Sequence, residues 1–331
     1  MSVIFEICKK DKVEELIGFI DKFWKKDHIF VRNRKLFDWQ HKSNDSYNFV
    51  LAIDGVEIIG ILGFIPTSQF SHELQANNEM WLAIWKVRED VKKPGVGILM
   101  LNFLRKKFNN PVICSLGLSQ QVIPLYKALK YEVGILEHRA FFNQDKVTFG
   151  SISPPKEFLV KLTNNKIEFD GKVQESDLIK CGALFKSKPQ KNPEYIVKRY
   201  IEHPVYEYKL LFFKNLDAVI SILVYRIVNI DNLVIARIVD VIGSNILEEK
   251  FNRPIAQFLQ KENIDYIDLV SNLVCGNKSG FIQNDDSFIL PNYFEPLEIR
   301  NVEVDFAYKS NSNSGSLSIF RGDSDQDRPN I

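Results

Sequence analysis

A strand, a glycine-containing turn and a helix follow one another between residues 81 and 108, and this unit constrains the fold more than any other stretch. Residues 81–87 are apolar and aromatic enough for a buried strand. After the turn at residues 92–97, apolar residues recur at helical spacing, and the basic run 105–107 suits the negative end of a helix. Glycine lets the backbone approach a ligand closely, and the first amides of a helix attract anions. The unit therefore predicts a phosphate or pyrophosphate site.

The spacing of the turn separates it from two common phosphate-binding motifs. A Walker loop needs Gly-x4-Gly-Lys-Ser/Thr, and Met100 occupies the third glycine position of Gly-x-Gly-x-x-Gly. Lys92-x-x-Gly95-x-Gly97 instead resembles the acyl-CoA motif of the GNAT acyltransferases, Arg/Gln-x-x-Gly-x-Gly/Ala. The lysine departs from that pattern and lacks the guanidinium fork of arginine. A turn with two glycines before a core helix remains an alternative interpretation.

Length and composition bound the possible classes of protein. With 331 residues, of which 45% are hydrophobic and 26% charged, the chain suits two globular domains. The formal net charge of +1 gives no overall electrostatic case for nucleic acid. The four cysteines, at positions 8, 114, 181 and 275, are far apart, which argues against a zinc site and for reduced, buried thiols. We therefore expect a cytoplasmic protein with no bound metal.

The N-terminus reads as a first strand and not as a signal peptide, because it carries an acid early and lacks a long apolar core. No apolar run approaches the length of a membrane span, so no membrane partner is expected.

The first half of the chain predicts the element order β, α, α, β, β, β, α, β, α, β, β. The expected strands are residues 3–8, 47–53, 56–65, 80–87, 112–116, 133–136 and 139–142, and the expected helices are 13–24, 36–41, 97–108 and 119–129. This order is a second point of resemblance to GNAT proteins. A third is the stretch from Ile123 to Tyr131, which is similar to the family's Ala-x-x-Leu-Tyr-x-x-Leu-Gly-Phe, with Lys130 in place of the glycine.

A similar pattern restarts after residue 190, which favours an α/β fold of two GNAT-like domains. We expect a GNAT domain over 1–145, a linker over 146–190, and a degenerate copy over 191–331 with a tail at 311–331. The expected elements of the copy are a helix at 193–201, strands at 206–213, 218–228, 232–242, 264–270 and 302–309, and a helix at 254–259. After Val241 the copy has no Gly-x-Gly and carries two acids, so we expect no CoA there.

The resemblance implies acyl transfer from CoA in the first domain. It implies that Tyr126 is the general acid beside the thioester sulfur, although a half-buried core aromatic is the alternative. Backbone near Val87 would bind the pantetheine arm as an added strand, and an amide of Ile84–Trp85 would meet the oxyanion. The expected CoA-binding residues are Ile84, Trp85, Val87, Lys92, Lys93, Gly95, Val96, Gly97 and Ile98.

The catalytic base is less defined. Glu79 lies at the head of the fourth strand, where several GNAT enzymes place a carboxylate. His28 and His41 lie in a segment that lines the acceptor pocket in the family, and histidine titrates near neutrality. Each of the three also has a structural interpretation, and a water relay without a dedicated base stays possible.

The acceptor is inferred from a basic, aromatic segment and from the tail. Arg32, Arg34 and Trp39 suit a phosphate and a base, although a solvated charged face explains such residues equally well. The tail resembles those of tandem-domain bacterial sugar N-acyltransferases that act on dTDP-linked 3-amino-3,6-dideoxyhexoses. That resemblance implies further acceptor contacts from Asp323, Asp325, Gln326 and Arg328. A disordered terminus is the alternative.

The sequence thus favours an acyltransferase that moves an acetyl- or hydroxybutanoyl-type group from CoA to a nucleotide-linked amino sugar in surface polysaccharide biosynthesis. A homodimer is possible. Three alternatives stay open: a Fem-type aminoacyl transferase, acylation of a protein or another small amine, and a non-catalytic binding protein.

Overall fold

A computed structural model describes residues 2–76, 79–149, 152, 154–155, 158–230, 232–292, 299–309 and 317–329. These residues form two compact units. The first unit contains the described residues within 2–133, together with 306–309 and 328–329. The second contains those within 134–305, together with 317–327.

The first unit is a mixed sheet with the strand order β1-β3-β4-β5-β6-β14, and β2 pairs β3 at one edge. Among the strands described in this unit, only β5 and β6 run parallel to each other. Its strands are β1 (Ile4–Lys9), β2 (Lys42–Ser43), β3 (Ser46–Asp54), β4 (Glu57–Pro66), β5 (Glu79–Val87), β6 (Val112–Leu116) and β14 (Val304–Lys309). Its helices are α1 (Val13–Phe19), α2 (Ile29–Arg32), α3 (Arg34–His41), α4 (Val96–Lys107) and α5 (Ile123–Ala128).

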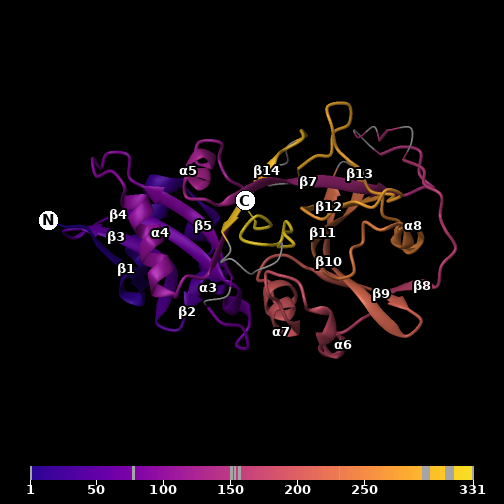
Figure 1. The fold of residues 1–331 in the computed structure, drawn as a ribbon, viewed down its shortest axis with the longest axis horizontal. Helices are drawn as coiled ribbons and strands as arrows, with labels where there is room; N and C mark the ends of the chain where they lie inside the picture. Colours follow the sequence, from indigo (N-terminus) through magenta and orange to yellow (C-terminus); the bar gives the residue numbers. More distant parts are fainter. Residues whose placement is uncertain are drawn as a thin grey trace. The chain divides into compact units, whose positions relative to one another are not determined.

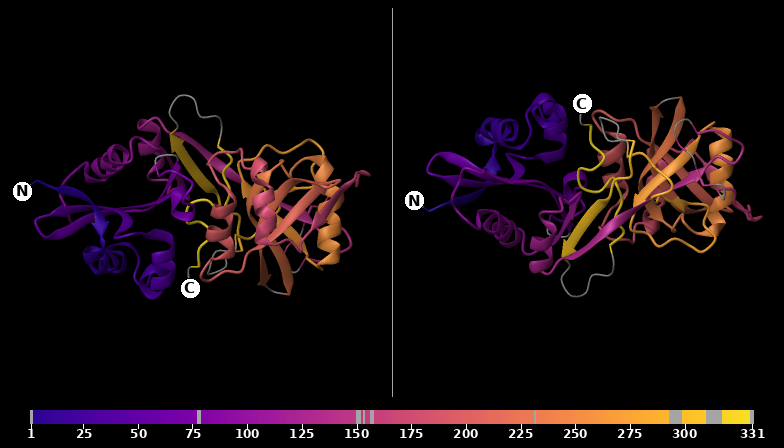
Figure 2. Two further views of the ribbon diagram at one scale, coloured as in Figure 1. Left: turned by 90° about the horizontal axis from the view of Figure 1, so that it is seen from below. Right: turned by 90° about the horizontal axis from the view of Figure 1, so that it is seen from above.

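Helices cover both faces of this sheet, and Figure 2 shows α4 on one side and α1 to α3 on the other. The alternation along β3 explains the two layers. Phe49 and Leu51 enter the core beneath α1 to α3, whereas Val50 and Ala52 enter the core beneath α4 and α5. A strand buried on both faces reads as a continuous apolar run, which is what residues 49–53 show.

The second unit is a sheet with the order β7-β12-β11-β10-β9-β8, and of its described strands only β11 and β12 are parallel neighbours. Its strands are β7 (Glu132–Phe142), β8 (Ile167–Asp170), β9 (Lys209–Asn215), β10 (Ala218–Ile230), β11 (Leu233–Gly243), β12 (Tyr266–Ser271) and β13 (Ile282–Gln283). Its helices are α6 (Glu175–Lys180), α7 (Pro193–Ile196) and α8 (Asn252–Lys261) (Figure 1). Helix α8 buries Ile255, Phe258 and Leu259 against one face of the sheet.

The other face of the second sheet carries charge. Arg226 on β10, Arg237 on β11 and Asp268 on β12 alternate with the apolar residues that face α8. Arg237 and Asp268 are each only 1% exposed. Charged side chains this deep need partners, and these two pair with each other, because Arg237 donates to Asp268 Oδ2 at 3.2 Å.

The bounds of the two units differ from those expected from the sequence, because the halves of the chain exchange a strand. The strand next to β6 is β14, from the C-terminal region, with Ala307 opposite Ser115. The strand next to β12 is β7, from the N-terminal half, with Ala140 opposite Asp268.

Most expected elements are present with small shifts. The expected helices at 13–24 and 193–201 each begin as α-helix and end in a π-helical turn, Ile20–Trp24 and Val197–Ile201. The two strands expected at 133–136 and 139–142 are one strand, β7. The expected linker contains β8 and α6. Residues 311–315 of the expected tail lie outside the described residues.

Candidate active site

In the first unit the register of the parallel pair ends before β5 does, and we call this end of the pair the fork. β5 and β6 are in register from Glu79↔Val112 to Leu82↔Ser115, whereas β5 continues to Val87. Directly after Leu82, β5 contains a bulge against β4, because Leu62 pairs Trp85 while Phe64 pairs Leu82. Ala83 and Ile84 therefore oppose the single residue Gly63, and a bulge of this kind turns backbone groups out of the ladder.

The N-terminus of α4 has the form expected for an anion site. Gly95 is its N-cap, with φ of +84°, which favours glycine. Leu99 N donates to Gly95 O over 2.9 Å, so the amides of residues 96–98 precede the first intrahelical bond. A Cβ on Gly95 would meet nothing within 4 Å, whereas one on Gly97 would lie 3.2 Å from Trp85 Nε1. Gly95 therefore borders open space, and Gly97 allows close packing of the helix on β5.

The other expected CoA-binding residues occupy different environments. Lys92 is exposed, whereas Lys93 Nζ pairs with Asp54 Oδ2 at 2.5 Å. Val96 is buried under the sheet, and Ile98 is half-buried. Trp85 and Val87 are half-buried on the strand that borders the fork.

Tyr126 lies on α5 and is only 2% exposed. A side-chain hydrogen bond joins it to Ser115, the last β6 residue in register with β5. Its ring is packed edge-on against Trp85, with 6.1 Å between centroids, and against Tyr131 at 5.1 Å. Burial raises the pKa of Tyr126 to about 12, so the hydroxyl keeps its proton at neutral pH. Its hydrogen bond to Ser115 places it at the end of the parallel register of β5 and β6.

Glu79 is buried at the start of β5, paired in register with Val112. It precedes Ala83 by four residues, which is roughly 13 Å along an extended strand. Glu79 thus lies on the same strand as the bulge but toward its other end.

The two histidines expected near the acceptor are both buried. His28 caps α2, because its Nδ1 accepts a hydrogen bond from Phe30 N at 3.3 Å. Burial, together with the positive charge of Arg328, lowers the pKa of His28 to about 3. His41 contacts the rings of Phe30 and Phe49, with centroid distances of 5.3 and 4.7 Å. These contacts give both side chains a packing role, and the low pKa makes His28 a weak base.

Two of the three residues expected to bind the acceptor from the basic, aromatic segment, Arg34 and Trp39, have side-chain partners within the first unit. Arg34 forms ion pairs with Glu14 and Asp38, each at 2.7 Å, and donates to Tyr47 Oη at 2.9 Å. Trp39 packs on Phe70 with 5.0 Å between ring centroids. Arg32 is exposed.

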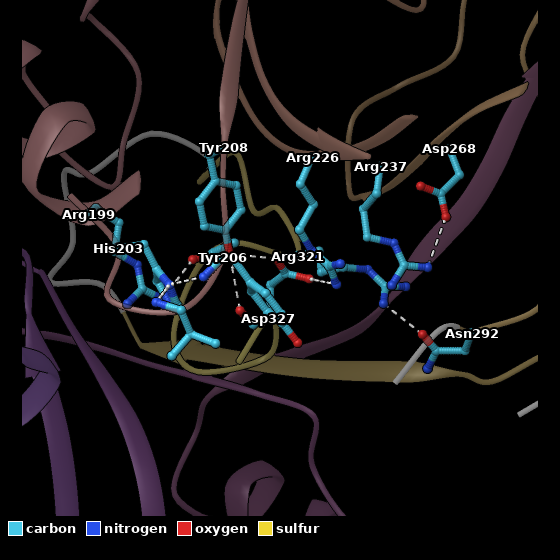
Figure 3. Close-up of polar contacts among 12 residues, drawn as sticks. Arg199, His203, Tyr206, Tyr208, Arg226, Arg237, Asp268, Asn292, Arg321 and Asp327 are labelled. Carbon is cyan, nitrogen blue, oxygen red and sulfur yellow. Dashed lines mark hydrogen bonds and ion pairs between the residues drawn. The ribbon is translucent and has the colours of Figure 1, made fainter. Parts of the chain in front are cut away.

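The tail residues lie in a dense polar network (Figure 3). Asp327 accepts from Arg226 Nε at 3.0 Å and from Tyr208 Oη at 2.7 Å. Asp323 pairs with Lys191 at 3.0 Å. Asp325 is buried and accepts from Gln326 Nε2 at 3.3 Å.

The pKa values of the buried aspartates in this network depend on the positive charges beside them. Burial would raise the pKa of Asp327, but Arg226 holds it below its usual range. Burial raises the pKa of Asp323 to about 6, although the positive charge of Lys191 opposes that shift. Arg328 belongs to the first unit, where its guanidinium lies 5.8 Å from the ring centroid of Phe30.

The sequence did not predict the partners of the tail, Lys191 and Arg226, or Asp240, which pairs with the same lysine. Arg226 and Asp240 interrupt long β-branched strands, and this interruption is the signal that could have indicated them. Lys191 stands in a stretch with no periodic pattern, so nothing local marked it.

Among the described residues, no group of three or more His, Cys, Asp or Glu could hold a metal ion. Of the helices that the structure describes, none is long and apolar enough to cross a membrane.

The strand order, the fork and the two-layer helix cover define a fold of the GCN5-related N-acetyltransferase type. The chain is similar to a GCN5-related N-acetyltransferase from Anabaena variabilis, with a TM-score of 0.58, 11% identity, and coverage of 93% of this chain and 72% of that one. It is also similar to a probable N-acyltransferase from Enterococcus faecalis, with a TM-score of 0.54, 10% identity, and coverage of 92% and 72%.

A third similar structure is the GCN5-related glucosamine N-acetyltransferase region of a fungal multi-domain beta-N-acetylglucosaminidase. Its TM-score is 0.51 at 11% identity, with coverage of 93% of this chain and 38% of that one. No family model and no curated protein sequence matches the chain.

Proposed function

We propose that the protein is an acyl-CoA-dependent N-acyltransferase whose first unit binds CoA and whose acceptor is a nucleotide-linked amino sugar, with surface polysaccharide biosynthesis as its pathway. The observation that carries the proposal is the arrangement at the fork. The β5 bulge, the open N-terminus of α4 at Gly95 and the buried Tyr126 all belong to the strands and helices around it.

In this proposal the amides that begin α4 hold the CoA pyrophosphate, with the exposed Lys92 beside it. The pantetheine arm pairs with the β5 edge between Ala83 and Val87 as an added strand. The thioester carbonyl then lies near the bulge, where an amide of Ile84 or Trp85 stabilises the oxyanion. Open space at Gly95 and the register that ends at Leu82 support this fit.

The reaction forms a C–N bond and breaks a C–S bond. The neutral amine attacks the thioester carbon, loses a proton, and the CoA thiolate leaves. Tyr126 donates a proton or a hydrogen bond to that thiolate, and its raised pKa keeps the hydroxyl protonated for the task. Glu79, directly or through water, is the proposed proton acceptor.

The acceptor class rests on two supports. A protein of the same fold is named as a glucosamine N-acetyltransferase region, which is amino sugar chemistry. In this chain, the half-buried Arg328 lies over the ring of Phe30, and the exposed Arg32 together with Arg328 adds positive charge around His28, which would suit the carrier's phosphates.

Isothermal titration with acetyl-CoA, followed by crystal soaks with CoA and a panel of dTDP-amino sugars, tests the proposal. We expect CoA at the fork of the first unit and turnover with at least one amino sugar. Failure to bind any acyl-CoA would refute the enzyme class. Binding of CoA with turnover only on a peptide or an aminoacyl acceptor would refute the sugar assignment alone.

A further inference from the structure

The second unit contains the same fork as the first. β11 and β12 are in parallel register from Ile235↔Tyr266 to Ile238↔Leu269. Directly beyond, β11 has a bulge, because Val224 pairs Asp240 while Tyr225 pairs Ile238. Both units thus contain a parallel pair that ends, followed at once by a bulge on the first strand of the pair.

In the second unit, a segment of the C-terminal tail lies within this fork. Gly322 N donates to Val239 O, at the β11 bulge, over 2.8 Å. One residue earlier, Arg321 N donates to Val270 O on β12 over 3.1 Å. Asn272 N, just past β12, donates to Ile319 O over 3.2 Å. The tail therefore satisfies backbone groups on both facing edges, as an inserted strand would.

Side chains anchor the segment on both sides. Phe320 enters the apolar core beneath α8 and is 2% exposed. Asp323 pairs with Lys191, whose Nζ also contacts Asp240 of the bulge at 2.6 Å. Burial would lower the pKa of Lys191, but the two carboxylates raise it above its ordinary value, so the lysine stays charged.

Gly322 fits this position only because it has no side chain. A Cβ there would lie 2.5 Å from Val239 O and 2.5 Å from Tyr200 Oη. The first contact is with the backbone that Gly322 N bonds, and the second is with a hydroxyl that donates to Asp240 at 2.9 Å. Neither can move without losing a buried hydrogen bond.

We propose that residues 319–322 take, in the second unit, the place that the pantetheine arm takes in the first. The second fork is an internal peptide-binding site whose occupant is the chain's own tail. Each chain therefore binds one acyl-CoA, and the second unit is closed to CoA by an occupant as well as by lacking the glycine turn. The comparison with pantetheine rests on the proposed function, whereas the occupancy of the fork does not.

Hydrogen–deuterium exchange of the full-length chain, with and without CoA, tests this occupancy. We expect the amides of Arg321 and Gly322 to exchange slowly and to be unaffected by saturating CoA. In the full-length variant Gly322→Ala they should exchange roughly tenfold faster or more, because the fork no longer accepts the tail. Gly182→Ala is the matched control, since a Cβ at Gly182 in the same unit meets nothing within 4 Å.

Titration calorimetry with CoA supplies the second measurement, with an expected stoichiometry of one per chain. Fast exchange at residues 321 and 322 in the unsubstituted protein would overturn the proposal even if Gly322→Ala failed to fold. Two CoA molecules per chain would overturn it as well. Slow exchange at these amides with no CoA binding at all would refute the proposed function and leave the tail's place in the fork supported.

Discussion

Removing only the hydroxyl of Tyr126 distinguishes a catalytic role from a structural one, because the two roles predict losses of different size in kcat and in stability. Tyr126→Phe keeps the ring that contacts Trp85 and Tyr131 and loses the hydrogen bond to Ser115. A net hydrogen bond contributes about 0.5–1.5 kcal/mol to stability. A general acid contributes roughly 10²–10⁴ in kcat, which is about 2.7–5.4 kcal/mol in the activation free energy. The two roles therefore predict effects of different size in different measurements.

The assay combines steady-state kinetics with denaturant unfolding, and Tyr131→Phe is the matched control. Tyr131 undergoes the same chemical change in the same core, with its ring 5.1 Å from that of Tyr126. We expect Tyr126→Phe to lose kcat by at least about a hundredfold with little change in CoA affinity. The control should keep its turnover. Equal turnover in both variants and the unsubstituted enzyme would show that Tyr126 is a core residue and that the thiolate leaves unaided.

Three further changes test the site, the tail and the pH response. Gly95→Asp should abolish CoA binding in calorimetry, because it places a negative charge where the phosphate is proposed to bind. Gly95→Ala has the same backbone strain without the charge, so it should bind CoA more weakly than the unsubstituted protein but still measurably. Asp327→Asn should lower the free energy of unfolding by about 3–5 kcal/mol, because it leaves a buried arginine uncompensated, while the exposed Asp286→Asn should change little. In the folded protein the pKa of His28 is lowered to about 3, well below the ordinary value of about 6.5 that applies to the unfolded chain. As pH falls below about 6.5 the unfolded chain is therefore protonated first, and the free energy of unfolding decreases. Between pH 7.5 and pH 5 this decrease is about 2 kcal/mol. His28→Asn, which keeps a side-chain acceptor for the helix cap, should abolish it. The control His72→Asn, at an exposed position, should leave it in place.

Each of these expectations has a contrary result. Unchanged CoA affinity in Gly95→Asp would place the phosphate elsewhere. Equal unfolding free energies for Asp327→Asn and Asp286→Asn would mean that the tail contact is not needed for the fold. An identical pH profile for His28→Asn and the unsubstituted protein would assign the acid sensitivity to other groups.

Local patterns in the sequence were enough to predict most strands and helices and the glycine turn. The run from Trp81 to Lys107 predicts strand, turn and helix because apolar spacing, glycine and terminal charge all agree within one short stretch. Apolar runs at residues 49–53 and 58–65 likewise predict buried strands, since burial on both faces removes polar alternation.

Only the tertiary structure decided which strands are neighbours and which charges meet. The sequence by itself assigns β14 to the second domain and β7 to the first. In the structure β14 pairs β6 of the first unit, and β7 pairs β12 of the second. Strand pairing depends on backbone hydrogen bonds, which leave no local pattern in the sequence. The same holds for the tail. A run with three aspartates and two arginines has no hydrophobic reason to dock, so an ordered tail needs polar partners that its own sequence does not identify. Its burial depends on Lys191 and Arg226, which are more than 100 residues away along the chain. Its polar residues could be buried only because those distant groups compensate their charges and the fork accepts their backbone.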